Sequence, residues 1–165
     1  MGLKSYIAHV RTQDPAMKSA AEILLYPGFW ALGYHRVAHW LYERKRFWLA
    51  RWVSNRARRR TGIEIHPGAV IGAYFFIDHG SGVVVGETAV VGDYVTMYHG
   101  VTLGGAGNKP GKRHPTIGNH VMIGAHAQVL GGITVGDGAR IGAGTVVTHD
   151  VPPDRTVRGD PGQVK

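Results

Sequence analysis

Residues 117–148 fall into sixes when they are written IGNHVM, IGAHAQ, VLGGIT, VGDGAR, IGAGTV and VT. Each group opens on an aliphatic side chain, and the same spacing extends back to residue 65 with two interruptions. The aliphatic positions of the whole series are Ile65, Ile71, Ile77, Val85, Val91, Met97, Leu103, Ile117, Ile123, Val129, Val135, Ile141 and Val147. A hexapeptide repeat of this kind is typical of a parallel β-helix.

Six residues suffice for one short strand and one turn, and side chains alternate in and out along a strand. Three strands make one triangular coil, so residues about 18 apart stack at a spacing of ~4.8 Å. We expect the aliphatic residue to point inward, the small or branched residue two positions earlier to fill a corner, and the glycine that often follows to relieve a tight turn. A helical period does not fit, because Asp93, Asp137 and Arg140 would fall on its apolar face.

The repeat breaks twice, and both breaks carry polar residues. The step from Ile77 to Val85 is eight residues and contains Asp78 and His79. The step from Leu103 to Ile117 is fourteen residues and contains a loop at 104–115. Repeat scaffolds place their insertions as loops on one face, often the binding face. We therefore expect the chemistry at these two interruptions.

Composition narrows the class of protein. The chain has 165 residues, 44% of them hydrophobic, and no cysteine, which excludes disulfides, a catalytic thiol and thiolate zinc sites. It has no long apolar run or cleavage signal, so we expect a cytoplasmic protein that makes no membrane contact. The organisation predicted is a helical segment at 1–60, a β-helix at 61–150 and a short tail at 151–165.

The formal net charge is +8, and most of the excess lies before the repeat. The basic residues there are Arg44, Lys45, Arg46, Arg51, Arg56, Arg58, Arg59 and Arg60. We interpret them as the solvated face and C-terminal end of a helix, where cations favour the helix dipole. Attraction of an anionic cofactor or partner is the alternative, and we do not expect nucleic acid.

Eight segments of the chain match one known family in order. They are Asp14-Pro15-Ala16, Leu25-Tyr26-Pro27-Gly28-Phe29, His35-Arg36-Val37-Ala38-His39, Thr61-Gly62-Ile63-Glu64-Ile65-His66-Pro67-Gly68-Ala69, Ile77-Asp78-His79-Gly80, Val85-Gly86-Glu87-Thr88, Gly100-Val101-Thr102-Leu103-Gly104-Gly105 and Lys112-Arg113-His114-Pro115. From Asp14 to Gly162 the chain thus resembles the serine O-acetyltransferases, which begin cysteine synthesis from serine. The resemblance implies a left-handed β-helix and a homotrimer with active sites in the clefts between neighbouring prisms.

The resemblance also implies the catalytic residues. His79 matches the general base of the family, and a histidine has a suitable pKa for taking up and returning a proton. Glu64 stands where many members have an aspartate that orients this histidine. The longer side chain is a departure from the family pattern. The stacking of coils places His99 directly above His79 on the next coil. His99 either lines the site or has a structural role only.

Substrate and cofactor residues follow from the same resemblance. Arg113 and His114 match the pair that binds the carboxylate of serine in the family. Asp14 and Asp78 match the family's acidic residues that bind serine. Asp14 before Pro15 is also a good helix N-cap, which alone would explain it. Glu87 is left open, since it could simply pair with a basic residue.

Acetyl-CoA is implied as a co-substrate rather than a resident cofactor, in the groove between two prisms. We expect Gly104 and Gly105 to permit close backbone approach, and Ala125 and Ala143 to keep the turn corners low. His126 interrupts a Gly-Ala pattern, so it either alters this edge or points to solvent.

Three other functions stay open. The chain could acetylate homoserine or a sugar, it could be a zinc enzyme like the γ-class carbonic anhydrases, or it could be a scaffold that keeps the fold alone. His114, His120 and His126 recur every six residues, which directs them to three faces of one prism and argues against a shared metal. The family's long C-terminal tail, which docks into cysteine synthase, has no counterpart before Lys165. We therefore expect no such complex. The helical segment is short compared with family members that assemble as hexamers, which favours a trimer.

Overall fold

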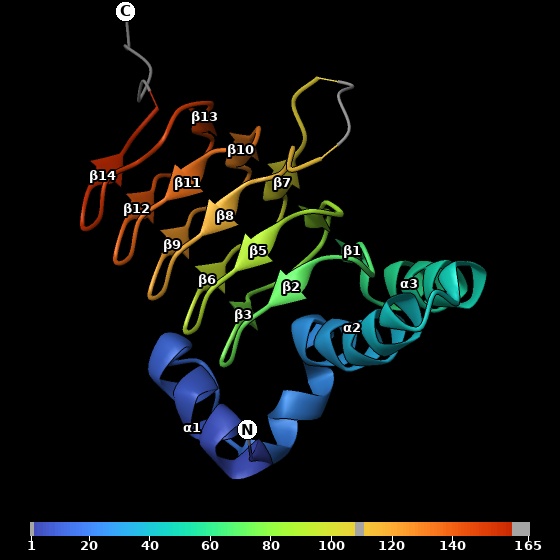
Figure 1. Ribbon diagram of the computed structural model, residues 1–165. Helices are drawn as coiled ribbons and strands as arrows, with labels where there is room; N and C mark the ends of the chain where they lie inside the picture. The colour runs from blue at the N-terminus through green and yellow to red at the C-terminus, as the bar shows by residue number, and fades with distance from the viewer. Residues whose placement is uncertain (1, 108–110, 160–165) are drawn as a thin grey trace, which may run out of the picture.

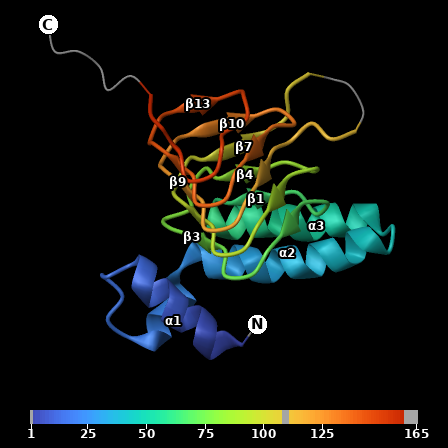
Figure 2. The ribbon, with the colours of Figure 1, turned by 60° about the vertical axis from the view of Figure 1, so that its left-hand side comes forward.

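The computed structural model describes residues 2–107 and 111–159, and residues 108–110 of the predicted loop and 160–165 of the predicted tail lie outside them. Helix α1 spans Leu3–Gln13, the 3-10 helix η1 spans Ala20–Leu25, and helices α2 and α3 span Pro27–Glu43 and Phe47–Thr61. Figures 1 and 2 show α2 and α3 side by side beneath the first coil of a stack of short strands.

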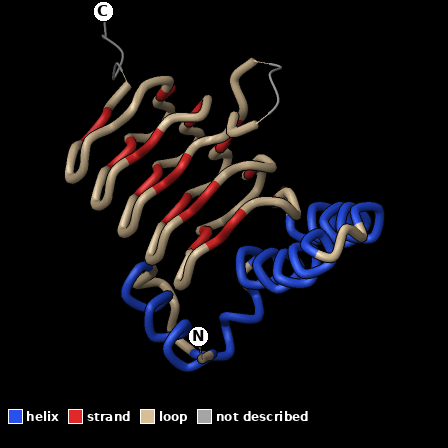
Figure 3. The backbone as a smooth tube through the Cα atoms, viewed as in Figure 1, coloured by secondary structure: helices blue, strands red, loops and turns tan. Residues whose placement is uncertain are grey.

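The strands form three parallel sheets, which are the three faces of a prism (Figures 1 and 3). The first sheet contains β1 (Glu64–Ile65), β4 (Val84–Val85), β7 (Thr102–Gly104), β10 (Gln128–Leu130) and β13 (Val146–Val147). The second contains β2 (Val70–Ile71), β5 (Val90–Val91), β8 (Thr116–Ile117) and β11 (Thr134–Val135). The third contains β3 (Phe76–Ile77), β6 (Thr96–Met97), β9 (Met122–Ile123), β12 (Arg140–Ile141) and β14 (Thr156–Val157).

The register records both interruptions of the repeat. Thr116 pairs with Thr134, which is the ordinary step of 18 residues. Glu64 pairs with Val84, a step of 20 that contains the two residues inserted around His79. Thr102 pairs with Gln128, a step of 26 that contains the eight extra residues of the loop at 104–115. The two insertions therefore leave the stack intact and project from its corners.

The core of the prism is the predicted one. The aliphatic residues of the repeat are buried, apart from the partly buried Ile71, and so are the corner residues Ala69, Val83, Ala89, Val95, Val101, Val121, Ala127, Ala139 and Thr145. Removing one Val, Leu or Ile side chain from water contributes about 1.5–3 kcal/mol. Repetition over successive coils gives the prism a continuous apolar interior.

The glycines after the aliphatic residues serve a different purpose from the one expected. A Cβ on Gly72 would lie 2.5 Å from the carbonyl oxygen of Gly92, so the next coil passes too close for any side chain. The left-handed turn positions are instead occupied by other residues, among them Tyr74 and Tyr94, both with φ 57°. Close approach, rather than relief of a tight turn, requires glycine at Gly72.

The helices close the first coil of the prism. Tyr6 of α1 donates its hydroxyl to the Phe75 carbonyl at 3.1 Å. Helix α3 buries a stripe of small residues, ends at Gly62 with φ 72°, and carries Arg58, Arg59 and Arg60 in its last turn, where cations complement the helix dipole. Within the described chain, no helix combines the length and apolarity needed to cross a membrane.

The coil continues beyond residue 150, so the predicted boundary there is wrong. Val151 forms a parallel bridge with Val135, and its amide donates to the Thr134 carbonyl at 2.9 Å. Pro152 and Pro153 follow in the turn, where their missing amide hydrogens cost no ladder bond. Strand β14 then pairs with β12.

Candidate active site

His79 projects from the corner between the third and first sheets. It lies in the insertion between β3 and β4, has a left-handed φ of 58°, and leaves 71% of its side chain exposed. The next residue, Gly80, also has a positive φ, of 79°, and a Cβ there would lie 2.5 Å from Ile63 Cδ1. The Asp78 carboxylate is 3.7 Å from His79 Nε2 and is mostly buried. The insertion thus presents an imidazole beside a carboxylate.

Asp14 reaches the same place from the helical segment. It ends α1 and is not a helix N-cap, so that interpretation was wrong. Its carboxylate accepts hydrogen bonds from the Ala16 amide at 2.8 Å and from the Tyr26 hydroxyl. The Tyr26 hydroxyl, followed by the Ala16 amide, lowers the pKa of Asp14. Burial and then Asp14 itself raise the pKa of Tyr26.

These groups share one pocket of about 260 Å³. Its lining residues are Asp14, Glu22, Leu25, Tyr26, Pro27, Asp78 and His79. The three carboxylates of Asp14, Glu22 and Asp78 and the His79 imidazole line it, which suits a ligand that carries a cation and a proton to be removed. Sequence reasoning did not assign a role to Tyr26, although it stands within one of the segments that resemble the family.

Glu64 does not meet His79 in the structure. Its carboxylate forms an ion pair with Arg58 of α3 at 3.0 Å. Among the described residues, the carboxylate within 4.0 Å of the His79 ring nitrogens is that of Asp78. The expected contact between Glu64 and His79 is therefore not formed, because α3 ends beside β1 and supplies Glu64 with a guanidinium partner.

A column of histidines rises from His79 along the same corner. The His79 and His99 rings are 5.7 Å apart between centroids, as the stacking argument predicted, and the His99 and His126 rings are 4.9 Å apart. The exposed His126 adopts a left-handed φ of 59°, and its amide donates to the His99 carbonyl at 2.9 Å. His126 thus packs on His99 in addition to facing solvent.

The residues expected to touch the cofactor divide between two corners. Ala125 and Ala143 continue the histidine column, since the Gly144 amide donates to the Ala125 carbonyl at 2.8 Å. Ala143 also lines a second pocket of about 320 Å³ with Arg140 and Arg158. Gly104 and Gly105 lie instead at the start of the long loop, where a Cβ on Gly105 would be 3.2 Å from His114 Nε2.

Arg113 and His114 occupy the corner between the first and second sheets. His114 is buried, and its Nδ1 accepts from the Thr88 amide at 3.2 Å. The neutral ring therefore carries its proton on Nε2. Thr88 Oγ1 accepts from the amides of Arg113 and His114, each at 3.1 Å. Burial, followed by Arg113, lowers the pKa of His114.

Glu87 lies beside this pair. One carboxylate oxygen accepts from the Tyr42 hydroxyl at 2.8 Å, and the other is 4.0 Å from Arg113 Nη2. Glu87 therefore pairs with a basic residue, the alternative that the sequence left open. Sequence reasoning did not single out Thr88 or Tyr42. Thr88 follows Glu87 within a matching segment, which was the signal available for it.

The two polar corners are separate within one chain. No hydrogen bond, ion pair or ring contact found among residues 2–107 and 111–159 joins the His79 pocket to Arg113 or His114. Strands β4 and β7 of the first sheet lie between them. His114, His120 and His126 follow strands of three different sheets, as expected from their six-residue spacing.

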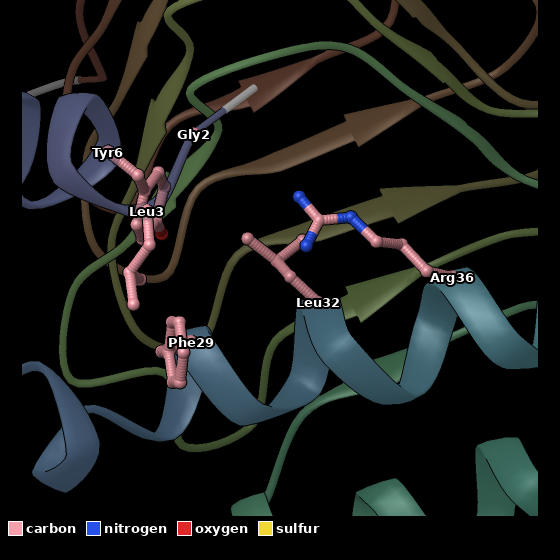
Figure 4. A pocket seen from close by; sticks show the side chains of 6 residues that line it. All are labelled: Gly2, Leu3, Tyr6, Phe29, Leu32 and Arg36. Carbon is pink, nitrogen blue, oxygen red and sulfur yellow. The ribbon is translucent and has the colours of Figure 1, made fainter.

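Another pocket, of about 200 Å³, lies between α1 and α2 (Figure 4). Its lining residues are Gly2, Leu3, Tyr6, Phe29, Leu32 and Arg36. Burial raises the pKa of Tyr6 to about 12, so its hydroxyl stays protonated and bonded to Phe75. With neither a carboxylate nor an imidazole in its lining, this pocket does not compete as a site of acid–base chemistry.

The six-residue repeat and its three parallel sheets place the chain in the class of hexapeptide-repeat proteins. Residues 114–149 match the family model described as bacterial transferase hexapeptide (six repeats). The serine acetyltransferase of Synechococcus elongatus is 58% identical over 153 residues, which cover 92% of this chain and 63% of that protein. The serine acetyltransferase of Bacillus licheniformis is 58% identical over 163 residues, 98% of this chain and 76% of that protein.

Structural comparison agrees. The crystal structure of the Brucella abortus serine acetyltransferase in complex with coenzyme A superposes with a TM-score of 0.92 at 45% identity, covering 98% of this chain and 65% of that one. The chain belongs to the serine acetyltransferase family. This confirms the predicted resemblance and the predicted left-handed parallel β-helix behind a helical segment. The chain spans less than two thirds of the Synechococcus relative.

Proposed function

We propose that this chain catalyses the acetyl-CoA-dependent O-acetylation of L-serine, the first step of cysteine biosynthesis. The observation that carries the proposal is the pocket in which Asp14, Asp78 and His79 converge, in a chain 58% identical to a serine acetyltransferase over 98% of its length. An acceptor with one ammonium, one carboxylate and one hydroxyl group matches the charges of the two corners.

His79 is the proposed general base. Its imidazole takes the proton from the serine hydroxyl while the oxygen attacks the thioester carbonyl carbon. The tetrahedral intermediate then expels the CoA thiolate, which receives that proton back from His79. Asp78, 3.7 Å from Nε2, stabilises the imidazolium that forms in between. Glu64 can take this role only if its carboxylate leaves Arg58.

Acceptor recognition requires both polar corners. Asp14 and Asp78 supply carboxylates for the ammonium group, while Arg113 and His114 supply N–H donors for the carboxylate. Because the two sets stand on separate corners of one prism, a complete site forms when a second copy brings its Arg113 to the first copy's His79. A closed ring of three copies repeats this contact at each cleft, so the proposal includes a homotrimer.

Acetyl-CoA is a co-substrate in this proposal. Its thioester lies at His79, and its arm follows the corner past Ala125 to Ala143. Arg140 and Arg158 in the pocket beside Ala143 suit phosphate groups, because guanidinium N–H donors match phosphate oxygens. Gly104 and Gly105 belong to the corner that the second copy presents, and they form the opposite wall of the cleft.

Steady-state release of CoA thiol tests the proposal, with serine, homoserine, threonine and a neutral sugar as acceptors. We expect the highest kcat/KM with serine and a loss of about 10³-fold in kcat for His79→Ala, within the range for removing a general base. Turnover of His79→Ala at the wild-type rate would remove the proposed base. A preference for the sugar would contradict the roles of Arg113 and Asp14.

A further inference from the structure

Glu87 stands between a helix and the loop that carries Arg113. It follows β4 at the corner between the first and second sheets, and 39% of its side chain is exposed. Oε1 accepts from the Tyr42 hydroxyl of α2 at 2.8 Å, and Oε2 lies 4.0 Å from Arg113 Nη2. One carboxylate therefore connects the helical segment to the second interruption of the repeat.

Tyr42 is held firmly on the helix side. Its ring packs edge-on against Phe47 at 5.1 Å and against His66 at 5.8 Å between centroids. Gly68 leaves room for the contact, because a Cβ there would be 3.2 Å from both Glu87 Cγ and Tyr42 Cε1. The Tyr42 hydroxyl lowers the pKa of Glu87, which favours the carboxylate form.

Glu87 and Thr88 act on the same two residues of the loop. Thr88 fixes the backbone, since its hydroxyl oxygen accepts from the amides of Arg113 and His114. Glu87 faces the side chain of Arg113, which is long and 42% exposed. A guanidinium has five N–H donors, so a single contact to Glu87 leaves a free edge for a second carboxylate.

We propose that Glu87, anchored by Tyr42, is a positioning residue that aims the Arg113 guanidinium at the acceptor's carboxylate. The proposal rests on the proposed function, in which Arg113 binds that carboxylate. Glu87 itself does not touch the acceptor. Its contact restricts the rotamers of Arg113 before the acceptor arrives, so Arg113 loses less side-chain entropy when it binds the carboxylate.

Kinetics of matched variants test the inference. For Glu87→Gln we expect the KM for serine to rise about fivefold, the upper end for losing a half-exposed ion pair, while the reacting atoms are not touched. The KM for acetyl-CoA and kcat should stay within about twofold of wild type. Tyr42→Phe should raise the same KM by about threefold, as the loss of one hydrogen bond predicts. Glu43→Gln, one position further along α2, is the control and should change none of these constants.

A double-mutant cycle separates positioning from general damage. If Glu87 acts through Arg113, then Glu87→Gln should not change the serine KM further in an Arg113→Ala background. The inference would be overturned if the two substitutions raised the serine KM by independent factors that multiply in the double variant, or if Glu87→Gln left the serine KM unchanged. Neither result would affect the proposed function, provided that the wild-type enzyme turns over serine. A wild-type enzyme without serine-dependent thiol release would overturn both. Thermal melts of each variant show that the fold is retained, and Glu87→Gln preserves side-chain volume.

Discussion

Replacing Gly86 with alanine should displace His114. An ideal Cβ at Gly86 would lie 1.9 Å from Cδ2 and 2.1 Å from Nε2 of the His114 ring. Non-bonded carbons rest ~3.5–4.0 Å apart, so the ring has to retreat by roughly 1.5–2 Å. That movement breaks the 3.2 Å hydrogen bond between the Thr88 amide and Nδ1. A misplacement of ~1 Å can cost about 10²-fold in rate, and we expect this loss in kcat/KM for serine.

Thiol-release kinetics and urea unfolding measure the two consequences of Gly86→Ala. We expect the free energy of unfolding to fall by about 2 kcal/mol, because a buried hydrogen bond is lost. The control is Gly33→Ala on α2, where a Cβ meets nothing within 4 Å. Alanine gains up to ~1 kcal/mol over glycine in a helix interior, so this variant should be as active as wild type and no less stable. A Gly86→Ala enzyme with wild-type kcat/KM for serine would refute the assigned role of His114.

Three further predictions concern pH and carboxylates. Burial lowers the pKa of His35 to about 4 from the ordinary 6.5, so folding favours its neutral form, and the free energy of unfolding should fall as pH drops from about 6.5 towards 4. In urea unfolding across this range, His35→Gln should lose less of that free energy than wild type or the control His149→Gln. Tyr26→Phe removes the hydroxyl that lowers the pKa of Asp14, so the acid limb of the pH profile of kcat/KM for serine should move to higher pH. If that limb does not move, Asp14 does not bind the ammonium group. Asp78→Asn should lower kcat/KM more than Glu64→Gln, because Asp78 is beside His79 while Glu64 is paired with Arg58, and the reverse order would show that Glu64 exchanges its partner during turnover.

The repeat could be predicted from sequence because its burial pattern is local and periodic. Every six residues the same environment returns, so the inward positions and the effect of both insertions on the register follow from counting. The stacking of His99 above His79 follows from the same count. The roles of the matching segments, in contrast, came from resemblance and not from periodicity.

Contacts between distant segments could not be predicted in this way. Asp14 looked like a helix cap because the local pattern of Asp before Pro fits one, yet its partner is Tyr26, twelve positions further on. Glu64 and Arg58 are six residues apart, but their pairing depends on where α3 ends against β1. The predicted helical segment at 1–60 likewise did not identify which face of each helix is buried, and Val37 and Leu49 turn out to be exposed.

In the proposed site, His79 of one copy acts together with Arg113 and His114 of another. Co-expression of His79→Ala and His114→Ala chains tests it, because each variant alone lacks one half of every site. Random mixing of two chains in closed rings should restore about one quarter of the wild-type sites. We predict serine-dependent thiol release near that fraction in the mixed sample. Activity in the mixture no higher than in either variant alone would contradict a site shared between copies.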